Sequence, residues 1–250
     1  MKGIILAGDS GSKLHPLTLG IPKQLIPVYD KPMIYYPIDT LVNAGITEIL
    51  VITTAEHQPL FKKAIGDYLG ANYTYAIQEE ANGIAQAIAI GREFVGKDSV
   101  CLITGDTIIT GDGVTEHIRK AIRTVQKSGN ATIFVENKTY PDQYGRVIVD
   151  GNKKVTDIVG FTDINHYYSI ASFYVFPNSV LKHIEKLQPS ERGRLEVLDL
   201  NKRFMAECKL QVRMLEPNCI CFDTNNADNI LRCGEYMMRI NKINNGARNN

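Results

Sequence analysis

The stretch GIILAGDSGSKL (residues 3–14) runs from an apolar segment directly into a turn that contains glycine. This order is typical of a buried strand whose carboxyl end leads into a ligand-binding loop. Gly8 and Gly11 permit a tight turn with inward-facing amides, and Lys13 supplies a cation, as expected of a loop that holds phosphate groups. The carboxylate of Asp9 is unexpected there, because it would repel a phosphate.

Similar apolar runs alternate with segments of helical periodicity through the first half of the chain. This alternation predicts an α/β fold with a doubly wound, mostly parallel (Rossmann-like) sheet. In the second half the pattern changes to short alternating runs around turn residues, which predicts antiparallel additions to the sheet. The expected strands are 3–7, 48–53, 73–78, 99–104, 131–136, 145–150, 153–161, 167–176 and a strand pair over 209–222, and the expected helices are 33–44, 57–68, 83–95, 114–127, 179–187, 193–207 and 226–243.

The composition, 44% hydrophobic and 22% charged over 250 residues, fits one domain over residues 1–243 followed by a polar tail over 244–250. A formal net charge of +1 provides no field to attract nucleic acid or an anionic membrane. No apolar stretch approaches the roughly 20 residues of a membrane-spanning helix, and the residues before the glycine turn are too few for a secretory leader. The five cysteines lack metal-binding spacing and are expected to be reduced, so a cytoplasmic protein is expected.

Two aspartates follow apolar runs at predicted strand ends. Asp106 lies in TGDT (104–107), and Asp223 lies in CFDT (221–224). A carboxylate at the rim of a sheet is a common ligand of the Mg²⁺ that accompanies a triphosphate, although a turn cap explains each aspartate equally well by itself. If the fold brings Asp223 near Asp106, the two form a carboxylate pair for one hard cation.

Two further polar side chains are placed for ligand binding. Lys23 precedes the apolar run of PKQLIPV (22–28), where a lysine is more often a solvated surface residue than a phosphate contact. Gln78 ends a predicted strand, and its amide offers the donor and the acceptor needed to recognise a base edge. Thymine, uracil and cytosine all satisfy an amide, and a helix cap or an exposed turn is the alternative role.

In this order and spacing, seven motifs resemble the sugar-1-phosphate nucleotidylyltransferase family, and within it the glucose-1-phosphate thymidylyltransferase branch. The resemblance runs from Met1 to about residue 243, and the most specific block is the longest one, residues 23–41. The motifs are MKGIILAG (1–8), KQLIPVYDKPMIYYPIDTL (23–41), GIAQAIAIG (83–91), GDTI (105–108), QYGRV (143–147), RGRLEVLDLN (192–201) and FDT (222–224).

The resemblance implies a single nucleotidyltransferase domain in which a sugar 1-phosphate attacks the α-phosphorus of a nucleoside triphosphate and expels pyrophosphate. It implies Mg²⁺ as the cofactor, dTTP or UTP as the favoured nucleotide, a phosphorylated small-molecule acceptor and a homo-oligomer. By position, it implies catalytic roles for Lys13, Lys23 and Asp106, metal binding by Asp106 and Asp223, nucleotide binding by Gly8, Asp9, Gly11, Ser12, Gln24, Gln78 and Gly83, and acceptor binding by Tyr144, Gly145, Gly160, Glu196, Arg192 and Arg194.

The chain departs from the family pattern in the phosphate loop and at the acceptor. The family's GGxGTRL is GDSGSKL here, so Asp9 adds a charge and Lys13 lacks the planar fork of an arginine. Where the family has E-E-K-P, with the lysine holding the sugar phosphate, this chain has Gly160 within IVGF (158–161). Losing one charged hydrogen bond costs about 1.5–3 kcal/mol, or roughly 10- to 150-fold in binding.

Two more positions differ, and they lead to two hypotheses. The family's D-T-G-T is DTNN (223–226), and Arg194 replaces the first glutamate of R-G-E-L-E. In the favoured hypothesis the enzyme uses an altered acceptor, with Arg194, Arg146 or Lys154 in place of the missing lysine. In the other, the chain is a catalytically impaired relative that binds a nucleotide or a partner subunit. A dinucleotide-dependent dehydrogenase is excluded, because the turn lacks G-x-G-x-x-G spacing.

Overall fold

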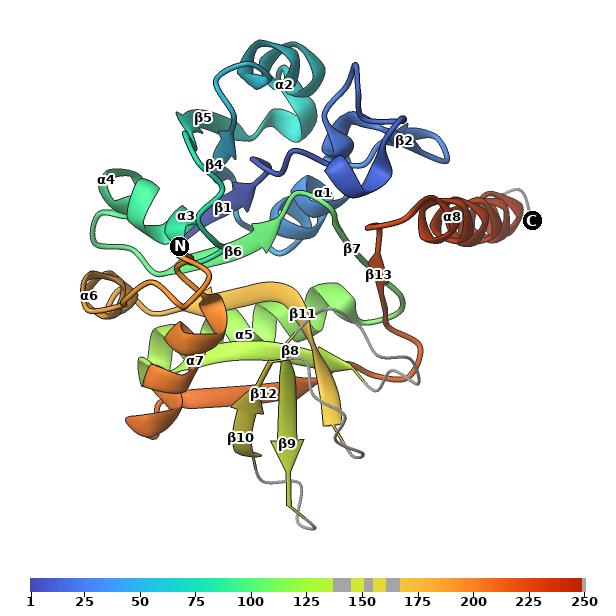
Figure 1. The fold of residues 1–250 in the computed structure, drawn as a ribbon. Coiled ribbons are helices and arrows are strands. Elements are labelled where there is room, and N and C mark those ends of the chain that lie inside the picture. Colours follow the sequence, from blue (N-terminus) through green and yellow to red (C-terminus); the bar gives the residue numbers. More distant parts are fainter. Residues whose placement is uncertain (137–144, 151–154, 161–166, 249–250) are drawn as a thin grey trace.

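The computed structural model describes residues 1–136, 145–150, 155–160 and 167–248. Within these residues a mixed sheet of nine strands forms the centre of the molecule (Figure 1). Strands β5, β4, β1 and β6 lie side by side and parallel, and the apolar runs of β4, β1 and β6 are buried on both faces, whereas β5 forms the partly exposed edge. This confirms the parallel core, whose strands are β1 Lys2–Leu6, β4 Glu48–Thr53, β5 Asn72–Ile77 and β6 Val100–Thr104.

One long strand, β11 (Tyr167–Phe176), joins the two halves of the sheet. Along one edge it pairs antiparallel with β6 and with β9 (Arg146–Val149), and β9 pairs with β10 (Val155–Val159). Along the other edge it pairs antiparallel with β8 (Ala131–Glu136), and β12 (Leu210–Met214) lies parallel to β8. The antiparallel additions are thus confirmed, although β8, expected among the parallel strands, is separated from β6 by β11.

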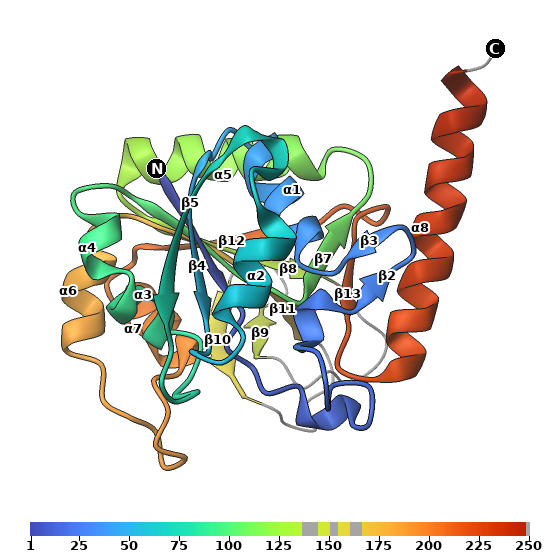
Figure 2. The ribbon, with the colours of Figure 1, turned by 90° about the horizontal axis from the view of Figure 1, so that it is seen from above.

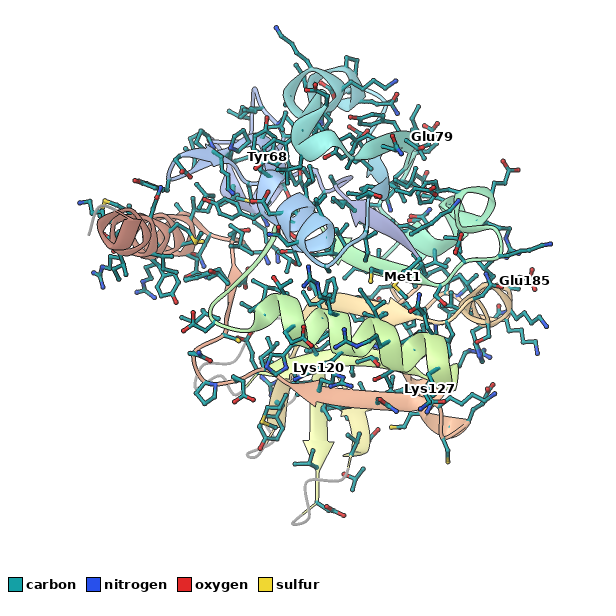
Figure 3. All side chains as sticks on the ribbon, turned by 180° about the vertical axis from the view of Figure 1, so that it is seen from behind. Met1, Tyr68, Glu79, Lys120, Lys127 and Glu185 are labelled. Carbon is teal, nitrogen blue, oxygen red and sulfur yellow. The ribbon has the colours of Figure 1, made fainter. Side chains whose placement is uncertain are left out.

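Helices cover both faces of the sheet, as a doubly wound fold requires (Figures 1 and 2). Alternate residues of β1 serve the two faces: Ile5 packs in the core beneath α1, α2 and α5, and Ile4 packs in the core beneath α3, α4, α6 and α7. Helix α5 is amphipathic, with Val125 buried and Lys120 and Lys127 on its outer side (Figure 3). These helices are α1 Tyr35–Asn43, α2 Gln58–Ile65, α3 Gln86–Ile90, α4 Arg92–Val95, α5 Val114–Ser128, α6 Val180–Glu185 and α7 Val197–Ala206.

Two short antiparallel ribbons lie outside the main sheet. β2 (Pro27–Val28) pairs with β3 (Lys31–Pro32), and β7 (Thr107–Thr110) pairs with β13 (Ile220–Asp223). Helix α8 (Ala227–Arg248) follows β13; its first half packs against β2 and β13 with Cys233 buried, and its C-terminal end extends beyond the rest of the molecule (Figure 2).

Three expectations about local structure need correction. The prediction of a strand pair over 209–222 is wrong, because β12 pairs with β8 in the main sheet, whereas β13 pairs with β7. The helix expected over 83–95 begins only at Gln86 and is divided at Gly91 into α3 and α4. The last helix continues through Arg248 rather than ending at residue 243.

The five cysteines are free thiols, as expected. Among the described residues, no helix combines the length and the apolar character that crossing a bilayer requires.

Candidate active site

A cavity of about 390 Å³ lies where β1, β5 and β6 end. The parallel register sets Leu6 beside Thr104, and Gln78 follows the last residue of β5. The loops that leave these strands therefore converge at one edge of the sheet, where doubly wound folds bind their ligands. Of the residues expected to bind or react, Asp9, Ser12, Lys13, Gln24, Gln78, Gly83, Asp106 and Arg194 line this cavity.

The glycine turn after β1 is closed by its own side chains. Gly11 adopts a left-handed conformation with φ 67°, and its N–H donates to Oδ1 of Asp9 at 3.0 Å. The Thr18 hydroxyl donates to the Gly11 carbonyl at 2.7 Å. The exposed Asp9 carboxylate thus accepts an amide N–H that a phosphate-binding loop would otherwise offer to its ligand.

Lys23 is buried directly behind the cavity wall. Its side chain is 1% exposed, and its Nζ donates to Oδ2 of Asp106 at 2.5 Å and to Oδ1 of Asn225 at 2.7 Å. The commoner expectation of a solvated lysine is therefore wrong here, because a carboxylate and an amide compensate the buried charge. Asp106 and Asn225 both line the cavity, so the Lys23 ammonium is separated from the cavity by the two side chains that accept its hydrogen bonds.

Asp106 is held as a carboxylate. Burial by itself raises the pKa of this carboxyl, but the Lys23 charge and hydrogen bonds from Lys23 and Thr104 outweigh burial and hold the pKa below its ordinary value. The backbone is fixed as well, since the Thr224 hydroxyl donates to the Asp106 carbonyl at 2.9 Å. The wall therefore presents a negative charge near neutral pH.

The β7–β13 ribbon brings the two candidate metal ligands into one region. Asp223 is the register partner of Thr107, the residue after Asp106. Its Oδ1 accepts the N–H of Asn225 at 2.9 Å, which closes the turn that carries Asn225 to the cavity. Asp223 thus lies across the ribbon from the residue that follows Asp106, although of the two aspartates only Asp106 lines the cavity.

Two glycines stand where a side chain would clash: Gly8 lies against the side chain of Gln78, which is 4% exposed, and Gly83 lies against the backbone of Leu195. A Cβ at Gly8 would lie 2.2 Å from Oε1 of Gln78. Gly83 has φ 98°, and a Cβ there would lie 2.3 Å from the Leu195 carbonyl oxygen. Because no side chain fits at either position, the backbone after β1 can pack against Gln78, and the loop after β5 can pack against Leu195.

The region expected to bind the acceptor is only partly described. Gly145 packs so closely that a Cβ would lie 2.5 Å from Cδ1 of Leu198. Gly160 is exposed at the end of β10, and a Cβ there would meet no described heavy atom within 4 Å. Arg146 is buried in β9 opposite Val159. Tyr144 and Lys154 lie outside the described residues.

Glu196 and Arg192 hold each other at the rim of the site. The Arg192 guanidinium, on a side chain that is 70% exposed, donates to Oε1 of Glu196 at 2.8 Å, and the Ser190 hydroxyl donates to the same oxygen at 3.1 Å. Arg194, two residues further along, is exposed and lines the cavity, as Lys13 does. Of the two arginines in this loop, Arg194 is thus the one placed to meet a ligand.

Sequence reasoning missed two side chains of the site. Asn225 stands in the altered DTNN turn, and that departure from the family pattern was the signal of its contact with Lys23. Gln86 accepts a hydrogen bond from Gln78 Nε2 at 2.6 Å, and nothing in the sequence separated it from other polar residues near a helix start. Gln24, which was expected, lines the cavity, and its buried Oε1 accepts no hydrogen bond from the described residues.

The doubly wound sheet, with a cavity at its strand ends lined by Lys13, Gln78 and Asp106, defines an α/β protein with a candidate ligand site. The chain belongs to the nucleotidyl transferase family, whose model matches residues 2–237.

Named relatives cover nearly the whole chain. It is 37% identical to the glucose-1-phosphate thymidylyltransferase of Neisseria meningitidis serogroup A over 98% of this chain and 85% of that one. It is 39% identical to the enzyme of the same name from Mycolicibacterium smegmatis over 96% and 83%. A crystal structure of a candidate glucose-1-phosphate thymidylyltransferase from Bacillus anthracis, with sucrose, superposes with a TM-score of 0.86 at 30% identity over 94% of each chain.

Proposed function

We propose that this protein transfers a nucleotidyl group from dTTP or UTP to a sugar 1-phosphate or a related phosphorylated acceptor and releases pyrophosphate. The observation that carries the proposal is the buried Lys23 behind Asp106 and Asn225 in the cavity wall. A buried ammonium at a site rimmed by carboxylates suits a reaction in which negative charge accumulates on phosphate oxygens.

The donor set fits Mg²⁺. Hard oxygen ligands are supplied by Asp106 and Asp223, and Mg²⁺ is commonly held by one or two carboxylates together with substrate phosphates. No group of three or more histidine, cysteine or acidic side chains in the described part of the chain forms a metal cage, so substrate oxygens would complete the shell. When bound, Mg²⁺ would neutralise phosphate charge at this rim.

The chain's own groups would act by positioning and by neutralising charge. An oxygen of the acceptor phosphate forms a bond to the α-phosphorus, the bond from that phosphorus to the β-phosphate oxygen breaks, and pyrophosphate leaves with the electron pair. Lys23 would face the α-phosphate by exchanging one of its present acceptors for a phosphate oxygen. Lys13, in the cavity lining, would meet the departing phosphates.

Asp9 is expected to weaken triphosphate binding. Asp9→Gly should lower the KM for the nucleotide about three- to tenfold at low salt, because it removes a negative charge and frees the N–H of Gly11. Asp9→Asn keeps an acceptor for that N–H, so it should lower the KM only by the part that comes from removing the negative charge. Initial rates at two ionic strengths give the KM of both variants for the nucleotide. A raised KM in Asp9→Gly would show that the carboxylate assists binding of the nucleotide.

Gly160 is the position at which a lysine should improve the use of a sugar 1-phosphate. Gly160→Lys should lower the KM for glucose 1-phosphate about 10- to 150-fold, because a Cβ there meets no described heavy atom within 4 Å and the lysine would gain a charged hydrogen bond. Gly160→Met controls for bulk without charge. An unchanged KM in Gly160→Lys would mean that Arg194 or another cation already performs this task.

The experiment that tests the function is pyrophosphate release by the purified full chain with Mg²⁺. Each of dTTP, UTP and CTP is combined with a panel of sugar 1-phosphates and other phosphorylated acceptors. Release that requires an acceptor establishes the transfer and names the acceptor. If the folded protein releases no pyrophosphate with any nucleotide and acceptor in the panel, the alternative of an impaired nucleotide-binding relative is favoured.

The resemblance also supports a homo-oligomer and a cytoplasmic location, which we propose on that basis. Light scattering on the purified chain measures the assembly.

A further inference from the structure

The side chain of Gln86 fixes which way the amide of Gln78 faces. Gln86 Oε1 accepts two hydrogen bonds, from the backbone N–H of Asn82 at 3.1 Å and from Nε2 of Gln78 at 2.6 Å. A backbone N–H can only donate, so the Gln86 atom that faces it must be the oxygen. The Gln78 atom that faces this oxygen must in turn be the amide nitrogen.

The remaining atoms of the Gln78 amide are thereby assigned. Oε1 lies against Gly8, and one N–H of Nε2 is left over after the bond to Gln86. Gln78 is almost fully buried and lines the cavity, so its side chain has little freedom to turn as a whole. Rotating the amide by 180° would place two oxygens in contact and remove the 2.6 Å hydrogen bond.

A fixed amide tells two kinds of base apart. Uracil and thymine present N3–H as a donor beside the acceptor O4, whereas cytosine presents N3 as an acceptor beside an amino donor. A base held in one position therefore needs one orientation of the amide for uracil or thymine and the reverse orientation for cytosine. A free glutamine could serve both patterns, but a locked one serves a single pattern.

We infer that Gln86 is a positioning residue that locks Gln78 and so makes the site select bases with N3–H over cytosine. This rests on the proposed use of dTTP or UTP. The loop geometry supports it, because the Leu195 N–H donates to the Asn82 carbonyl at 2.8 Å and the Ala85 N–H donates to the Leu195 carbonyl at 3.2 Å. These bonds hold both ends of the segment between Asn82 and Gln86, so the acceptor that locks Gln78 is itself held in place.

The test is the ratio of kcat/KM for UTP to that for CTP, measured in the full chain with its best acceptor. The unaltered protein should prefer UTP by at least about tenfold, since a site with a mismatched buried polar group rejects its ligand strongly. Gln86→Met removes the acceptor and should bring the ratio within about threefold, mainly by raising kcat/KM for CTP relative to UTP. Gln86→Glu keeps an acceptor for both donors and should retain the preference.

The outcomes separate the lock from a merely structural role. A structural defect would lower kcat/KM for UTP and for CTP in parallel. An unchanged ratio of these two values in Gln86→Met would overturn the inference. Equal loss of preference in Gln86→Glu and Gln86→Met, or no preference in the unaltered protein, would also overturn it. If Gln86→Met does not fold, Gln86→Ala gives the same comparison.

The failure of this inference can be told from the failure of the proposed function. If the unaltered protein releases pyrophosphate with an acceptor but the ratio does not respond to residue 86, the function stands and the lock is wrong. If the unaltered protein neither releases pyrophosphate nor binds UTP in a calorimeter, both are wrong.

Discussion

Asp106→Asn should reduce kcat for nucleotidyl transfer about 10²- to 10³-fold while leaving the size and shape of the side chain almost unchanged. The carboxylate balances the buried ammonium of Lys23, and in the proposed reaction it would also offer a charged ligand to Mg²⁺; an amide can do neither. Pyrophosphate release at saturating nucleotide and acceptor measures the effect. A kcat within threefold of the unaltered protein would remove Asp106 from the catalytic machinery.

The same variant has a pH signature in stability. Because the pKa of Asp106 is lower in the folded protein than its ordinary value of 3.8, the stabilisation from this carboxylate is fully present above 3.8 and is lost as the pH falls through the lower folded value. Urea unfolding of the two proteins should therefore differ most at neutral pH and converge on acidification below 3.8. A difference that grows in acid would contradict this assignment.

Lys23→Met should abolish detectable transfer, with a loss of about 10³-fold or more, and should destabilise the fold by about 3–5 kcal/mol. The variant leaves Asp106 in a largely buried site without its counter-charge, and it removes the cation that would face the α-phosphate. Urea unfolding and pyrophosphate release measure the two losses separately.

The chain offers a matched control in Lys31, which pairs with Asp39 but is 26% exposed. Lys31→Met should cost less than Lys23→Met, because water reaches a pair that is only partly buried. The double variant Lys23→Met with Asp106→Leu removes both charges, so it should recover much of the stability but none of the activity. Recovery of activity in the double variant would show that Lys23 serves only to satisfy Asp106.

The parts of this fold that follow from local chemistry could be predicted from the sequence. Branched apolar runs specify buried strands, and the residues at their carboxyl ends converge because parallel strands end at one edge. That is why Asp106 and Gln78, each placed just past a strand, line the cavity as expected of ligand-binding residues. Glycines that meet backbone or side chains closely, such as Gly83, mark the same edge.

The remainder depends on partners that the local pattern does not name. The burial of Lys23 requires Asn225 from the far end of the chain, and no periodicity links the two. The strands over 210–214 and 220–223 look like a hairpin, but each forms its ladder with a strand far away in the sequence. The role of Gln86 depends on which atom of its side-chain amide faces Gln78, and the sequence does not indicate that orientation.

The β7–β13 ribbon determines when the protein can first become active during its synthesis. The hydrogen bond from the Thr224 hydroxyl to the Asp106 carbonyl joins residues 118 positions apart, so it cannot form until Thr224 has been synthesised. A ribosome-bound chain that has exposed β1 to β6 already has its glycine turn and Gln78, but it lacks Asp223, Thr224 and Asn225. Nascent chains are thus chemically silent until nearly the whole polypeptide has emerged, and ribosome-attached fragments that end before Ile220 should neither consume nucleotide nor release pyrophosphate.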